Sequence, residues 1–200
     1  MKLTFLNIPR LIKKYKSPKL LWGLKPNKIV VKSLNYIKTG TVLDLGAGEG
    51  RNSIFLSKKG FTVTALDISK EALEKCRELA KDKKLKIKTL VSRIEDFTFK
   101  EKYNYILSVA TLHLVEKDKV LKTIKLIKEN TKTGGINLLT VFTNKDPGIK
   151  QFPDLYFFKE TELKTIYRDW EILHFENYTK HEGHDGPHTH QISAIIARKI

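Results

Sequence analysis

The chain has 200 residues, 40% of them hydrophobic, which suits one globular domain with a substantial core. Its single cysteine, Cys76, excludes a disulfide framework, and no apolar run approaches the roughly 20 residues that cross a bilayer. The formal net charge of +16 raises the question of nucleic-acid binding, but only six of the 38 basic residues are arginines, and the lysines are spread along the chain. We therefore expect a cytoplasmic protein, monomeric or homodimeric, with no membrane partner, and we favour a lysine-rich solvated surface over nucleic-acid binding, which the charge does not exclude.

Strand-like and helix-like segments alternate from residue 27 onward, which predicts an α/β fold with a parallel sheet. The expected helices cover residues 28–37, 51–59, a stretch capped by Ser69 that includes 72–80, then 116–129 and 159–167. The expected strands cover residues 41–45, 61–66, 86–91, 103–109, 136–142, 170–178 and 191–198. Only a dozen residues join the last two strands, so they are expected to form a hairpin with an antiparallel final strand.

The prolines and clustered aromatic residues of 144–158 interrupt this alternation and predict a lid or rim. We expect a single domain over residues 1–200. It would consist of an N-terminal extension or cap (1–26), a ligand-binding core (27–142), and a C-terminal part (143–200) with the lid, the last helix and the hairpin.

The stretch from Val42 to Asn52 joins a strand to a helix through glycines at alternate positions, G-x-G-x-G. Glycines allow a tight turn and a close approach to a ligand because no Cβ stands in the way, and the helix start adds free N–H groups. Dinucleotide enzymes use G-x-G-x-x-G instead. Here Asp44 stands two residues before Gly46, a spacing typical of S-adenosylmethionine enzymes.

Several segments in order resemble class I S-adenosylmethionine-dependent methyltransferases, and within them most closely the tellurite-resistance type. They are VLDLGAGEGRNSIFLSKKGFTVTALDIS, IEDFTFKEKYNYILS, TGGINLL, FFKETELKTIYRDWEI and ISAIIARK. The resemblance runs from about residue 27 to the end. It implies a Rossmann-like, mostly parallel seven-stranded sheet with an antiparallel last strand and helices on both faces. It also implies S-adenosyl-L-methionine as cofactor and methyl transfer to a small molecule, either a metalloid oxyanion or a thiol-like acceptor.

The resemblance also implies which residues hold the cofactor. Asp44 would face the methionine ammonium, and Asp67, 21 residues beyond Gly46, would accept the ribose hydroxyls. Asp96 would accept the adenine amine, with Glu95 as a competing carboxylate, and Arg51 either reaches the cofactor carboxylate or lies on the surface. The whole expected set is Asp44, Gly46, Ala47, Gly48, Gly50, Arg51, Asp67, Ile68, Glu95, Asp96, Ser108 and Val109.

Residues 181–190 hold four of the six histidines, in a loop expected at the carboxyl edge of the sheet. Three interpretations stay open: a polar loop with no role, a substrate-facing base or anion-binding set, and a metal site of His188 and His190 with His184 or His181. Tellurite-type relatives carry a polar His/Arg stretch at this level, and this chain has His188 and His190 where arginines are expected. His113 either lies near the substrate entrance or packs against a helix. We expect His113, His188 and His190 to face the substrate, and we expect no bound metal.

Three other functions remain to be weighed. The net charge motivates an RNA or protein methyltransferase, but the fourth strand ends in Ser108-Val-Ala-Thr, without a [DN]-P-P-[YFW] motif or a cysteine nucleophile. A nicotinamide oxidoreductase and a metal-binding protein without catalysis are the other two.

Overall fold

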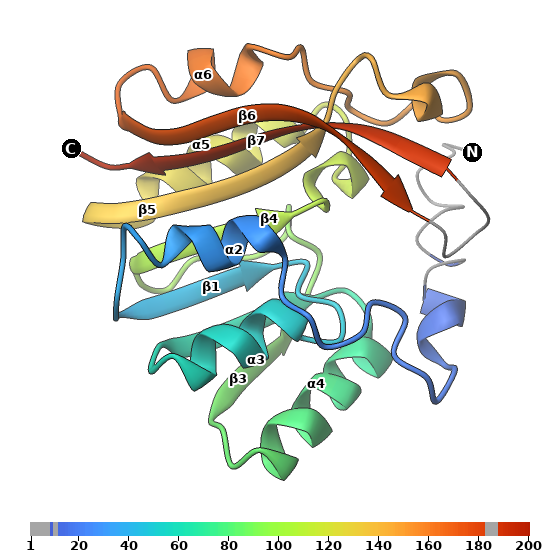
Figure 1. Cartoon of the computed structure of the whole chain (residues 1–200), viewed down its shortest axis with the longest axis vertical. Coiled ribbons are helices and arrows are strands. Elements are labelled where there is room, and N and C mark those ends of the chain that lie inside the picture. The colour runs from blue at the N-terminus through green and yellow to red at the C-terminus, as the bar shows by residue number, and fades with distance from the viewer. Residues whose placement is uncertain (1–8, 10–11, 183–187) are drawn as a thin grey trace.

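The computed structural model describes residues 9, 12–182 and 188–200 of the chain (Figure 1). Seven strands form one sheet in the order β3-β2-β1-β4-β5-β7-β6. Neighbouring strands are parallel except at β7, which is antiparallel to both β5 and β6. The predicted Rossmann-like sheet with an antiparallel last strand is therefore confirmed. The strands are β1 (Thr41–Leu45), β2 (Thr62–Asp67), β3 (Ile87–Val91), β4 (Tyr103–Val109), β5 (Thr131–Phe142), β6 (Glu171–Glu182) and β7 (His188–Arg198).

Helices cover both faces of the sheet, because successive strand residues point to opposite sides. In β1, Val42 packs into one apolar cluster and Leu43 into another. The helices on the Val42 side are α2 (Lys28–Ser33), α3 (Arg51–Lys58) and α4 (Lys70–Asp82), and those on the Leu43 side are α5 (Val120–Glu129) and α6 (Glu162–Ile166). Short 3-10 turns, η1 (Leu112–Leu114) and η2 (Pro147–Lys150), follow β4 and β5. Within the described part of the chain, no helix combines the length and the apolar character that a membrane span requires.

β5 differs from the sequence prediction, since it begins at Thr131 rather than at residue 136. The turn expected at Gly134 and Gly135 is a kink inside the strand. Gly134 has a φ of 75°, and a Cβ on Gly135 would lie 2.7 Å from the carbonyl oxygen of Asn104 on β4. The two glycines let the strand bulge and then resume its pairing with β4.

The predicted histidine loop is also wrong in its boundaries. β6 and β7 pair as far as Glu182 and His188, whereas β5 pairs with β7 only as far as Ile192. The hairpin therefore continues beyond the sheet as a two-stranded ribbon, residues 179–182 and 188–191. Backbone hydrogen bonds between the two strands sustain the ribbon although its side chains are mostly polar. His181, His188 and His190 consequently lie on strands, and His184 lies outside the described residues.

Three helices are clearly shorter than expected, and one of them is α6, which covers Glu162–Ile166 rather than 159–167. α2 ends at Ser33 rather than at residue 37, because the Ser33 hydroxyl bonds to the Val30 carbonyl and the chain continues in turns. α5 begins at Val120 rather than at 116, after a turn in which the Lys119 amide donates to the carbonyl of Glu116.

Candidate functional site

A cavity of about 770 Å³ lies at the carboxyl ends of the parallel strands, within the range of small-molecule sites. It is lined by the N-terminal segment, the glycine loop with the ends of β2 and β4, the turn after β3, the η1 region, residues 146–157 of the segment expected as a lid, and the ribbon. The sequence-predicted residues in its wall are Gly46, Ala47, Gly48, Arg51, Asp67, Ile68, Glu95, Val109, His113, His188 and His190.

The glycine loop and Asp67 hold each other in place at one end of the cavity. Gly46 and Gly48 have φ values of 76° and 55°, and the amides of Gly46 and Ala47 donate to the Leu66 carbonyl. The buried carboxylate of Asp67 accepts the amide of Gly48 at 2.8 Å and that of Ser69 at 2.9 Å. Burial raises the pKa of Asp67, and these hydrogen bonds to the ionised form oppose that shift. The result is a carboxylate fixed at the cavity wall.

Asp44, Gly50 and Ser108 lie behind the wall rather than in it. The buried Asp44 carboxylate accepts the Ser53 hydroxyl at 2.7 Å, and burial raises its pKa to about 6. Gly50 starts α3 with a φ of 84°, and a Cβ there would lie 2.3 Å from the Cys76 sulfur, so this glycine serves helix packing. Ser108 is fully buried, and its Oγ has no hydrogen-bond partner among the described residues.

The turn after β3 places Glu95 in the cavity wall and turns Asp96 away from it. The Glu95 side chain is buried and pairs with Arg93, whereas 58% of the Asp96 side chain is exposed. Phe97 packs against the core and fixes this orientation. Of the two carboxylates considered for the adenine amine, Glu95 therefore lies in the wall of the cavity, and the preferred Asp96 does not.

The N-terminal segment supplies wall residues that the sequence did not indicate, among them Tyr15 and Trp22. The buried carboxylate of Glu49, in the glycine loop, accepts the amides of Leu21 at 2.8 Å and Trp22 at 3.2 Å. The Trp22 indole donates to the Tyr15 hydroxyl at 3.1 Å. Glu49 lies within the glycine-loop motif, and an acidic side chain buried there requires hydrogen-bond partners from elsewhere in the chain.

Arg51 faces the cavity beneath this segment, which decides between the two positions expected for it. Its guanidinium lies 5.9 Å from the centroid of the Trp22 ring. Burial lowers its pKa, and the nearby carboxylates of Glu182 and Asp44 oppose that effect. Arg51 is therefore a charged wall residue and not a surface one.

Three stacked rings form the opposite end of the cavity. The His113 and Phe142 rings lie 4.1 Å apart between centroids, and the Phe142 and His190 rings lie 4.2 Å apart. His113 is buried, and its Nδ1 has no hydrogen-bond partner among the described residues. Burial lowers the pKa of His113 to about 3, with a contribution from His190, so the ring is neutral at physiological pH. The segment 144–158, which the sequence predicts as a lid or rim, adds Phe152, Leu155 and Phe157, and these give this end an apolar lining.

The comparisons with known proteins agree with this geometry. Residues 21–187 match the family model described as tellurite resistance protein TehB. The chain belongs to the TehB family. The predicted resemblance to class I S-adenosylmethionine-dependent methyltransferases of the tellurite-resistance type is thereby confirmed, with S-adenosylmethionine as the cofactor.

A similar TehB relative is the probable S-adenosyl-L-methionine-dependent methyltransferase TehB of Haemophilus influenzae. It is 34% identical over 146 residues, which make up 73% of this chain and 51% of the relative. The crystal structure of TehB from Haemophilus influenzae superposes with a TM-score of 0.79 at 29% identity, covering 94% of this chain and 65% of that one. The chain thus spans about half the length of the curated TehB relatives that it matches.

A more distant structure shares the fold of this TehB family member. It is the N-methyltransferase NodS from Bradyrhizobium japonicum in complex with S-adenosyl-L-homocysteine, with a TM-score of 0.74 at 14% identity. The match covers 95% of this chain and 97% of NodS, so the two chains share this fold over nearly their whole lengths.

Proposed function

We propose that this chain transfers the methyl group of S-adenosylmethionine to a small acceptor that enters the same cavity. One observation carries the proposal: the glycine loop with Asp67 forms one end of the cavity, and an aromatic and histidine-lined space forms the other. Methyl transfer is an in-line displacement at a sulfonium, which depends mainly on holding acceptor and methyl group in line. A cavity with two chemically distinct ends suits that requirement.

The cofactor would lie along the strand ends. The Asp67 carboxylate would accept the ribose hydroxyls, and the Gly46–Gly48 backbone would follow the methionine portion. Glu95 is the proposed partner of the adenine amine, because its carboxylate is the one in the cavity wall. Arg51 is the proposed partner of the cofactor carboxylate. Asp44 lies behind the wall and would reach the ammonium through water.

The acceptor would lie between the stacked rings and the lid. Aromatic side chains dominate this end, which favours a soft acceptor such as a thiol, or a metalloid oxyanion as the family description suggests. A soft sulfur, selenium or tellurium centre needs no strong base. This agrees with the pKa of His113 near 3, which makes its neutral imidazole a weak base, and we propose a packing role for that ring. Cys76 is buried away from the cavity wall and is not proposed as a nucleophile.

The decisive experiment is a methyl-transfer screen with labelled S-adenosylmethionine over thiols, metalloid oxyanions, amines and bulk RNA. We expect transfer to thiols or oxyanions, and loss of cofactor binding by calorimetry in Asp67→Ala. Lys70→Ala, a mostly exposed lysine next to the cofactor region, is the matched control. Unchanged cofactor affinity in Asp67→Ala would refute the cofactor placement. Transfer confined to RNA would instead favour the nucleic-acid function that the net charge of +16 suggests.

A further inference from the structure

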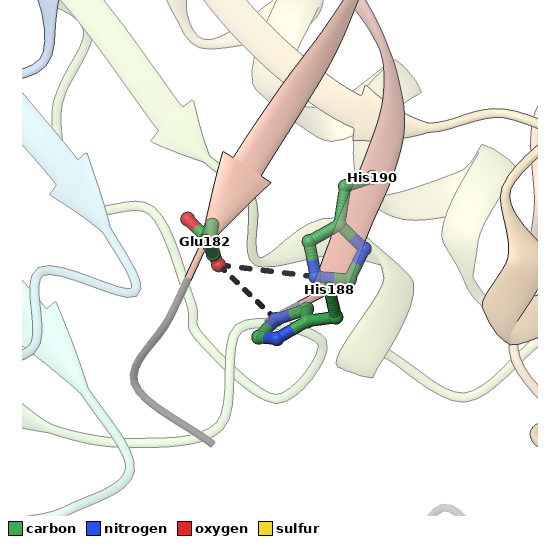
Figure 2. Close-up of side chains that lie close together, drawn as sticks. All are labelled: Glu182, His188 and His190. Carbon is green, nitrogen blue, oxygen red and sulfur yellow. Dashed lines mark ion pairs between the residues drawn. The ribbon is translucent and has the colours of Figure 1, made fainter. Parts of the chain in front are cut away.

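Glu182, His188 and His190 gather three potential metal-ligand atoms at the edge of the cavity. Glu182 is the last residue of β6 and pairs in register with His188, the first residue of β7. His190 stands two positions further on, so its side chain points to the same face as that of His188. Figure 2 shows the carboxylate of Glu182 on one strand directed at the two imidazole rings on the other.

The spacing of these atoms is close to that of a coordination sphere. Oε2 of Glu182 lies 3.7 Å from Nε2 of His188 and 3.8 Å from Nε2 of His190. One ligand atom from each residue lies within 4.8 Å of the others. Ligand atoms around tetrahedral zinc, bound at about 2.0–2.2 Å, are about 3.3–3.6 Å apart. Rotamer adjustments of a few tenths of an ångström at the Glu182 contacts, and more between the histidines, would complete the geometry.

Asp146 orients the His190 ring in the way that metal-binding histidines require. Its Oδ2 lies 3.0 Å from Nδ1 of His190, while the amides of Gly148 and Gln191 donate to the same carboxylate at 2.8 Å and 2.9 Å. Asp146 is buried, with 1% of its surface exposed, so these contacts hold its carboxylate in place against the His190 ring. The contact of the Asp146 carboxylate with Nδ1 favours the tautomer that carries its proton there, and Nε2 is the ring nitrogen on the side of Glu182. This is the carboxylate–histidine–metal arrangement that fixes the tautomer at zinc sites.

Packing also fixes the ring plane. Phe142 stacks on His190 with an interplanar angle of 9°, and His113 stacks on the other side of Phe142. Lys180 pairs with the Oε1 atom of Glu182, which leaves Oε2 as the oxygen that faces the histidines. Exposed ion pairs contribute little to stability, so stability alone does not account for the stacked ring and the second ion pair around these residues. The fixed orientation of the Glu182 carboxylate and the His190 ring is what a metal site requires.

We propose that Glu182, His188 and His190 bind one divalent transition-metal ion of the zinc class, with Asp146 as the supporting carboxylate. All three ligands line the cavity, so the fourth coordination position belongs to the cavity side. Two histidines, one carboxylate and an open position form the ligand set of catalytic zinc sites. The identity of the fourth ligand rests on the proposed function.

A thiol acceptor fits that fourth position. It would bind as the thiolate and release its S–H proton to solvent, because the metal favours the deprotonated sulfur. The sulfur lone pair would then form the new S–CH₃ bond while the sulfonium–CH₃ bond of the cofactor breaks, leaving S-adenosylhomocysteine and a thioether. The metal would thus promote deprotonation of the acceptor thiol, for which the neutral imidazole of His113 is too weak a base.

The test is a titration of chelator-treated protein, made without a histidine tag, with Zn²⁺ against a chromophoric competitor. We expect one Zn²⁺ per chain, with affinity reduced at least about a hundredfold in His188→Ala, His190→Ala and Glu182→Gln. Asp146→Asn should cost about 10- to 100-fold. His181→Ala, on the same ribbon, and His174→Ala, paired with Glu176, are the controls and should bind as the wild type does. Calorimetry with S-adenosylmethionine shows whether each variant is folded.

Co²⁺ provides the second readout. We expect the visible spectrum of tetrahedral Co²⁺, and a new thiolate charge-transfer band when mercaptoethanol is added. Absence of stoichiometric zinc, or binding that survives all three ligand substitutions, overturns the metal site. A cobalt spectrum that responds to selenite and not to the thiol overturns the assignment of the fourth ligand. If zinc and cobalt bind but no acceptor is methylated, the proposed function fails and the metal site stands.

Discussion

The buried Asp44 carboxylate allows a quantitative test of how its ionisation changes the free energy of unfolding. Asp44→Asn keeps the shape of the side chain and its ability to accept the Ser53 hydroxyl. Burial raises the pKa of Asp44 from 3.8 to about 6, so the folded protein holds this proton to a higher pH than the unfolded chain does. Its stabilising effect is complete below about pH 3.8 and is lost as the pH rises through about 6. At pH 7 the ionised carboxylate costs about 3 kcal/mol.

We therefore expect Asp44→Asn to match the wild type near pH 4 and to be more stable by up to about 3 kcal/mol at pH 7. Urea unfolding of both proteins across this range measures the difference, and the contributions of all other titrating groups cancel in it. Ser53→Ala is the matched control. It removes the hydrogen bond that lowers the Asp44 pKa, so its pH dependence should move to higher pH. A stability difference that does not change with pH, or a wild type that is the more stable protein at pH 7, would refute this account.

Three further predictions concern neighbouring residues. Gly46→Ala would put a Cβ 2.2 Å from the Thr111 methyl at a φ of 76°, so thermal unfolding should show a loss of about 1–3 kcal/mol, partly restored by adding Thr111→Gly. Burial raises the pKa of Cys76 to about 12, so a thiol reagent at pH 8 should label the native protein about a thousandfold more slowly than the denatured one. Tyr105→Phe removes a buried hydroxyl 2.9 Å from the Ser33 hydroxyl and should cost about 1 kcal/mol in urea unfolding, with cofactor affinity unchanged. A fully stable Gly46→Ala would contradict the first prediction, and equal labelling rates of the native and denatured protein would contradict the second. A loss of cofactor affinity in Tyr105→Phe would contradict the third.

The sequence predicted the features that depend on neighbours in the chain. The glycine loop, Asp67 at the end of β2 and the alternation of strands and helices are local patterns, and the structure reproduces them. The choice between Glu95 and Asp96 was beyond a local pattern, because the packing of Phe97 decides which carboxylate faces inward.

The acceptor end of the cavity and the wall formed by the N-terminal segment both depend on contacts between residues far apart in the chain. Asp146 and His190 are separated by 44 positions, and Leu21 and Glu49 by 28, so no spacing rule connects them. The ribbon was missed for a different reason. Its polar side chains lack the apolar alternation that indicates a strand, while the backbone pairing that sustains it leaves no trace in composition.

Glu49 joins three parts of the molecule through one carboxylate: the glycine loop, the segment that carries Leu21 and Trp22, and Lys75 of α4. Because the loop and the segment share the cavity wall, ordering of the segment and occupancy of the cofactor site are thermodynamically linked. Such coupling is reciprocal. Cofactor binding should therefore slow hydrogen exchange at the Leu21 and Trp22 amides, and loss of their bonds to Glu49 should weaken cofactor binding. One buried carboxylate would thus connect the backbone of the N-terminal segment to the occupancy of the cavity.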